Sequence, residues 1–229
     1  MKSFFASLLG PNIHVELADG TRRPLNDYLI PNAIFSIAGL ILIASTFLPY
    51  WRMDMTAPQY PKGLYVNVFV NRLEGDMKEV DALNHYLGMP PLDMGGQLER
   101  SLSLFAILSI GLILTASVFV HNRLAVLLAL PMLAYPLIFL ADLWYILYTY
   151  GHSIDPQSAL GGAIKPFTPP LVGEGGIGQF GTYSSLEVGF WLAVMAAIVT
   201  LIGLYFHRRA YKPVLEAKKR TEQNAAVQA

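Results

Sequence analysis

The side chains best suited to binding a metal ion gather in residues 52–100 of this chain. Five of its eight methionines lie there, together with one histidine, His85. Thioether and imidazole ligands without a thiolate are typical of copper in an oxidising compartment. The candidate copper ligands are His85, Met89, Met53, Met55 and Met94.

A short helix is expected to carry His85. Asp76 and Glu79 have the spacing of a capping box, while Gly88 and Pro90 are typical of a helix end, so a helix is predicted over residues 77–87. Asp81 and His85 then share one face, and the Asp81 carboxylate could orient the imidazole as a second-shell partner of the metal. The alternative is an ordinary surface pair beside methionines that only fill gaps in a core.

Two strand-like runs precede that helix. WRMDMTA and GLYVNVFVNRL are joined by PQYPKG, whose prolines and glycine favour a hairpin with a longer loop. Residues 52–100 are therefore predicted to form a small α+β domain made of a β-hairpin and one helix.

The rest of the chain has the composition of a membrane protein. Hydrophobic residues make up 54% and charged residues 14%, whereas a soluble domain has roughly 25% charged residues. We predict an integral membrane, mainly α fold with four transmembrane helices, because four segments approach the roughly 20 apolar residues that cross a bilayer. These segments are residues 30–51, 101–120, 124–150 and 186–206, with a tight turn at 121–123.

Basic residues predict the orientation. The arm at 1–29 and the tail at 207–229 carry several Lys and Arg residues, and the turn at 121–123 carries Arg123, so all three are expected in the cytoplasm. Both outer segments, 52–100 and 151–185, are then expected outside it. The expected location is a bacterial cytoplasmic (inner) membrane. Phe4, Phe5, Leu8 and Leu9 could rest on the bilayer surface, and the tail is expected to be a frayed helix or disordered.

Glycine and proline dominate residues 151–185, which favours a loop without regular structure. Its KPFTPP stretch has polyproline character and could lie as a strap across the first outer segment or a partner subunit. GEGGIGQFG lacks the Lys-Ser/Thr ending of a phosphate-binding loop, so no nucleotide is expected. The net charge of zero gives no indication of nucleic acid.

Asp142 is an acid within the third span, which is by default a candidate functional group. The spans show no second member of a proton relay, which favours a structural role for Asp142 over a functional one. The chain has no cysteine and no recognisable catalytic motif, and we expect it not to be an enzyme.

The stretches APQYPKGLYVNVFVNRLEGDMKEVDALNHYLGM and KPFTPPLVG resemble an uncharacterised family of bacterial four-span membrane proteins. The resemblance extends from about residue 47 to about residue 190. Genes of this family lie near copper-handling, nitrous-oxide-reductase-type or respiratory cytochrome genes, so the resemblance implies a copper or respiratory context. It assigns no role to Asn84, His85 or Met89.

Together these features favour a non-enzymatic accessory protein, working with a partner membrane or periplasmic protein in extracytoplasmic copper handling or in assembly of a respiratory metalloenzyme. Two alternatives remain: a structural docking subunit of a larger membrane complex, and a permease component that uses Asp142.

Overall fold

The computed structural model describes residues 14–16, 22–120, 124–177 and 180–228. It confirms a mainly helical chain with a small β-sheet. Within the described residues, four helices are long and apolar enough to cross a membrane. They are α2 (Asn26–Ser45), α4 (Gln97–Ala116), α5 (Leu124–His152) and α6 (Val188–Gln228). The chain divides into two compact units, which we call the terminal unit (Met1–Leu40, Ile110–Leu133 and Ala196–Ala229) and the sheet unit (Ile41–Ser109 and Ala134–Met195).

In the terminal unit, two short strands, β1 (His14–Glu16) and β2 (Arg22–Pro24), pair antiparallel before α2. Helix α6 continues through Pro213 to Gln228, so the tail is helical throughout its described length. His207 of α6 is buried, and its ring centroid lies 6.2 Å from that of Phe35 on α2. The predictions for Phe4, Phe5, Leu8, Leu9 and the turn at 121–123 lie outside the described residues.

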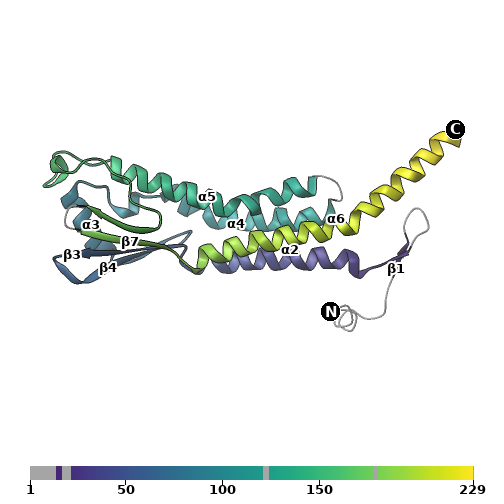
Figure 1. The fold of residues 1–229 in the computed structure, drawn as a ribbon, viewed down its shortest axis with the longest axis horizontal. Coiled ribbons are helices and arrows are strands. Elements are labelled where there is room, and N and C mark those ends of the chain that lie inside the picture. The colour runs from purple at the N-terminus through teal and green to yellow at the C-terminus, as the bar shows by residue number, and fades with distance from the viewer. Residues whose placement is uncertain (1–13, 17–21, 121–123, 178–179, 229) are drawn as a thin grey trace. The chain divides into compact units, whose positions relative to one another are not determined.

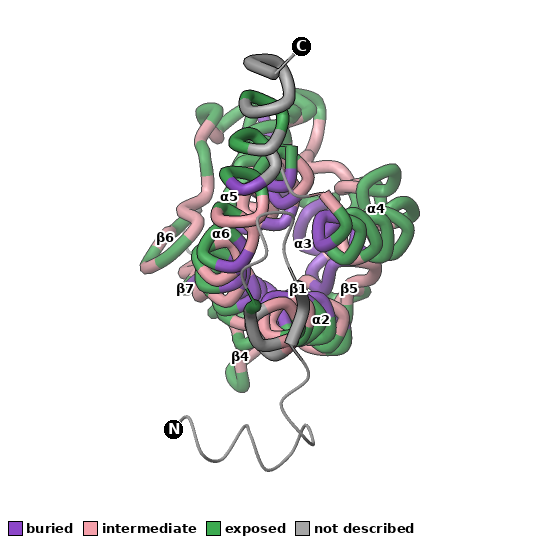
Figure 2. The backbone as a smooth tube through the Cα atoms, turned by 90° about the vertical axis from the view of Figure 1, so that its right-hand side faces the viewer, coloured by how far each residue is buried: buried purple, intermediate pink, exposed green. Residues whose placement is uncertain are grey.

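Apolar side chains cover the exposed surfaces of the long helices. Figure 2 shows that α4 is exposed around most of its circumference. Its exposed apolar residues include Leu98, Leu102, Leu104, Phe105, Leu108 and Leu112. Such a surface is unusual on a soluble protein and is suited to lipid, which supports a multi-pass membrane protein.

The sheet unit contains a five-stranded antiparallel sheet, in the order β5–β4–β3–β7–β6. Its strands are β3 (Trp51–Ala57), β4 (Tyr60–Val68), β5 (Leu73–Gly75), β6 (Gly173–Ile177) and β7 (Phe180–Leu186). The predicted β3–β4 hairpin is confirmed. The long loop predicted within it is wrong, because only Pro58 and Gln59 separate the strands.

The expectation that residues 151–185 lack regular structure is also wrong. Strand β7 pairs with β3 along its length, from Trp51 opposite Leu186 to Thr56 opposite Gly181, and Figure 1 shows the two strands side by side. The glycines permit close approach: a Cβ on Gly181 would lie 2.6 Å from Thr56 Oγ1, and one on Gly175 2.8 Å from Pro170 Cδ. Here glycine allows strand packing instead of preventing it.

Helix α3 (Met77–Leu87) has the predicted bounds, and Gly88 ends it in the left-handed conformation at φ 81°. The capping box is wrong: the Asp76 side chain makes no cap, and its carboxylate instead accepts a hydrogen bond of 2.9 Å from the Tyr65 amide on β4. Asp76 therefore ties the start of α3 to the sheet.

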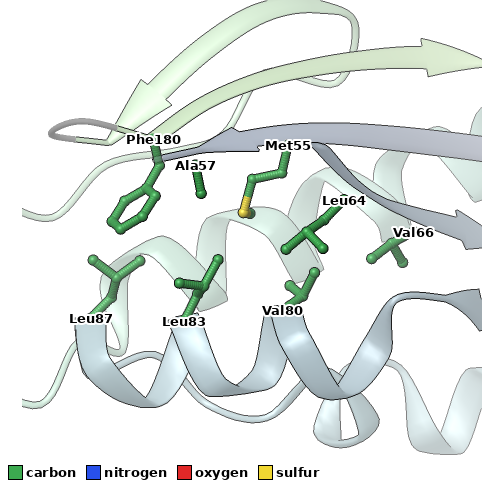
Figure 3. Close-up of a cluster of buried hydrophobic side chains, with 8 residues drawn as sticks. All are labelled: Met55, Ala57, Leu64, Val66, Val80, Leu83, Leu87 and Phe180. Atoms are coloured by element: carbon green, nitrogen blue, oxygen red, sulfur yellow. The ribbon is translucent and has the colours of Figure 1, made fainter. Parts of the chain in front are cut away.

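The core of the sheet unit lies between α3 and one face of the sheet. Val80, Leu83 and Leu87 point from α3 toward side chains of β3, β4 and β7, as Figure 3 shows. The sheet contributes Met55, Ala57, Leu64, Val66 and Phe180. The period-2 alternation of β3 and β4 places these residues on a single face.

Candidate ligand-binding cavity

The structure divides the five candidate copper ligands into two groups. Met55 is buried in the core, Met53 and Met89 pack partly buried against it, and all three line one cavity. His85 is exposed on α3, Met94 is 66% exposed, and neither lines that cavity. Among the described residues, no cluster of three or more His, Asp or Glu side chains could hold a metal ion.

Asp81 has a structural partner that sequence reasoning missed. Its carboxylate accepts a 2.7 Å hydrogen bond from the Leu92 amide, in the 3-10 turn Leu92–Met94. In the described part of the chain no hydrogen bond joins Asp81 to His85. Asp81 therefore holds the segment between α3 and α4 against α3.

The cavity has a volume of about 500 Å³ and lies wholly within the sheet unit. Its first wall is the inner face of the sheet, where Met53, Met55 and Val66 stand, and α3 adds Val80 and Leu87. Its second wall is one stripe of α5 facing the first turns of α4. This wall contains Ser103 and Ala106 of α4 and Tyr135, Ile138, Phe139, Asp142, Ile146 and Tyr150 of α5.

The strap (residues 165–170) forms the third wall through residues 167–170. Two hydrogen bonds fix it. The Phe167 amide donates to the Gly151 carbonyl at 3.0 Å, and just beyond the strap the Trp51 indole N–H donates to the Leu171 carbonyl at 2.6 Å. The prolines of the strap leave it few backbone N–H donors. It is nevertheless held by α5 at Phe167 and by β3 just beyond Pro170.

The chain before the strap packs on the C-terminal end of α3. The Asp155 amide donates to the Gly88 carbonyl at 2.8 Å, and the Leu160 amide donates to the Tyr86 carbonyl at 3.2 Å. A Cβ on Gly88 would lie 2.3 Å from Ser158 Oγ. Glycine is therefore required at position 88 for two reasons: the left-handed backbone conformation and the close contact with Ser158.

Two carboxylates and one guanidinium supply the charge of the cavity. Asp142, half-buried on α5, and Glu99, exposed in the first turn of α4, both line it. Neither forms an ion pair with any residue that the structure describes. Glu99 is the second acid that the sequence did not reveal, because it lies just before the predicted span.

Arg100 lines the same cavity and is oriented by its own segment. Its Nε donates to the Gly95 carbonyl at 3.1 Å, and its Nη2 donates to the Asp93 carbonyl at 2.6 Å. Tyr150 fixes the preceding residues by donating its hydroxyl proton to the Pro91 carbonyl at 2.6 Å. Since a guanidinium carries five N–H donors, Arg100 keeps donors for a ligand.

Two aromatic residues of the second wall also pack on Tyr50. Tyr135 and Phe139 line the cavity, and their ring centroids lie 6.4 and 4.8 Å from that of Tyr50. The Tyr50 hydroxyl donates to Ser45 Oγ at 2.6 Å, because Ser45 gives its own proton to the Leu42 carbonyl. Burial raises the pKa of Tyr50, so its hydroxyl stays a donor at neutral pH.

The arrangement is that of a binding site: a mostly apolar chamber with a few charged groups gathered at one place. No protein-family model matches the chain, and no curated protein matches it either.

Proposed function

We propose that this chain is a non-enzymatic membrane accessory protein that holds a largely apolar ligand in the cavity of its sheet unit. The cavity is the observation that supports this proposal. At about 500 Å³ it falls within the range of small-molecule sites, and its walls come from the sheet with α3, from α4 and α5, and from the strap.

The proposed setting is a bacterial cytoplasmic membrane, with the sheet unit on the extracytoplasmic side and both termini in the cytoplasm. The basic residues of the C-terminal helix, among them Arg208, Arg209 and Lys212, support this orientation. In this setting the cavity lies where a ligand could pass between the bilayer and a partner membrane or periplasmic protein.

Filling the cavity with a larger side chain tests the proposal. Ile138 is 58% exposed and lines the cavity from α5, whereas its neighbour Leu137 is 69% exposed and does not line it. Ile138→Trp is expected to reduce the ligand that co-purifies with the protein by about tenfold or more, while Leu137→Trp keeps it. Solvent extraction of the detergent-purified protein followed by mass spectrometry measures both.

A wild-type protein without any bound ligand, or equal ligand in both tryptophan variants, would overturn the proposal. The Leu137 variant controls for the effect of a bulky aromatic residue on α5 itself.

Copper handling is the second candidate function, and one observation favours it. Met53, Met55 and Met89 line the same cavity, and three thioethers form a soft ligand set suited to Cu(I). In this form of the hypothesis His85 and Met94 are not ligands, since neither lines the cavity. The protein would then hold copper for assembly of a respiratory metalloenzyme.

Replacing Met53, Met55 and Met89 together by leucine is expected to abolish Cu(I) binding, because leucine conserves volume but offers no sulfur. Metal analysis after anaerobic loading with Cu(I) measures the effect. Met94→Leu and His85→Ala are the controls, and both should keep wild-type copper. Copper retained by the triple variant would exclude the thioether site.

A further inference from the structure

We propose that the ligand of the cavity is a phospholipid with a primary ammonium headgroup, of the phosphatidylethanolamine type. Its ammonium would lie between Glu99 and Asp142, its phosphate at Arg100, and one acyl chain along the wall formed by α4 and α5. This inference rests on the proposed function of binding an apolar ligand and names the class of that ligand.

The charges give the first argument. Glu99 and Asp142 face one cavity and lack an ion pair among the described residues. Two carboxylates that line one mostly apolar cavity repel each other, and a cation bound in that cavity relieves the repulsion. A primary ammonium donates three hydrogen bonds, so it can serve both carboxylates at once, which a quaternary ammonium cannot.

Arg100 gives the second argument. Two backbone carbonyls hold its guanidinium, which lines the same cavity, so a positive charge is fixed in place with donors still available. Guanidinium groups bind phosphate through paired hydrogen bonds. The lining of the cavity therefore contains both carboxylates and a guanidinium, which matches a zwitterionic headgroup and disfavours a headgroup with only negative charge.

Depth in the membrane gives the third argument. Trp144, Tyr145 and Tyr148 are exposed on the last turns of α5, and such aromatic residues gather at the level of lipid headgroups. Asp142 lies within one turn of Trp144 and Tyr145 along the helix. Below this level, away from that end of α5, the lining continues as Phe139, Ile138 and, on α4, Ala106.

That continuation is apolar and lies on helices that can cross a membrane. A lipid can therefore keep its head beside Glu99 and Asp142 while its chain stays at hydrocarbon depth. The apolar stripe of α5 follows from its 3.6-residue period, since Tyr135, Ile138, Phe139 and Asp142 fall on one face.

The test is lipid binding by the full-length protein. Native mass spectrometry of the protein with equimolar phosphatidylethanolamine, phosphatidylcholine and phosphatidylglycerol should show preferential binding of phosphatidylethanolamine. Glu99→Gln with Asp142→Asn should weaken that binding by at least about tenfold, because charge-assisted hydrogen bonds are lost. Glu79→Gln, which removes an exposed acid from α3 outside the cavity, should have no effect.

If the double variant fails to fold, the two single variants serve in its place, and each should weaken binding severalfold. Equal affinity for the three lipids, unchanged binding by the variants, or a divalent metal ion bound at Glu99 and Asp142 would overturn the inference. A bound ligand of a different apolar class would overturn the inference alone. Absence of any ligand in the wild-type protein would overturn the proposed function as well.

Discussion

Truncating Leu83 to alanine is expected to lower the free energy of unfolding by about 2–5 kcal/mol. Leu83 is 7% exposed and packs from α3 into the cluster formed with Met55 and Phe180 of the sheet. Removing it costs transfer free energy and leaves a void that α3, held at Asp76 and Gly88, cannot collapse to fill.

Denaturant titration in detergent, followed by tryptophan fluorescence, measures this loss. All three tryptophans, Trp51, Trp144 and Trp191, belong to the sheet unit and report on its unfolding. Lys78→Ala is the matched control, because Lys78 is exposed on the same helix and its loss should change stability by less than about 0.5 kcal/mol. Equal stability of the two variants would show that α3 does not depend on this core.

Local signals explain how far the fold could be predicted. The bounds of α3 could be predicted because Gly88 and the prolines after it mark its end and Val80, Leu83 and Leu87 mark its buried face. Strand β7 could not be predicted in this way, because its partner β3 lies more than a hundred residues earlier in the chain. Pairing between strands so far apart in the chain leaves no local sequence pattern from which the pairing could be predicted.

The candidate site could also be predicted only in part, because some of its residues share a local pattern and others meet only through tertiary packing. The spacing of Met53 and Met55 places both on one face of a strand, and that face does line the cavity. His85 was grouped with them by composition alone, although the apolar face of its own helix indicates that it points elsewhere. Whether Glu99 and Asp142 line one cavity depends on how α4 packs against α5, which spacing along the chain does not encode.

Replacing Gly151 by alanine is expected to open the cavity. A Cβ at this position would lie 1.8 Å from the Phe167 carbonyl oxygen, and neither backbone segment can shift that far while the hydrogen bond from the Phe167 amide to the Gly151 carbonyl is kept. The strap must leave α5, so the wall formed by residues 167–170 is lost. The ligand that co-purifies with the protein should fall by about tenfold or more, and proteolysis within the strap should become faster.

Gly162→Ala provides the comparison, because its Cβ would meet only the Pro156 carbonyl at 3.2 Å, away from the cavity lining. Mass spectrometry of extracted ligand and of timed proteolytic fragments separates the two variants. Wild-type ligand content together with fast cleavage of the strap in Gly151→Ala would mean that the strap covers the cavity without helping to retain its contents. Loss of both ligand and protection would show that a single backbone contact, permitted only by glycine, holds the third wall in place.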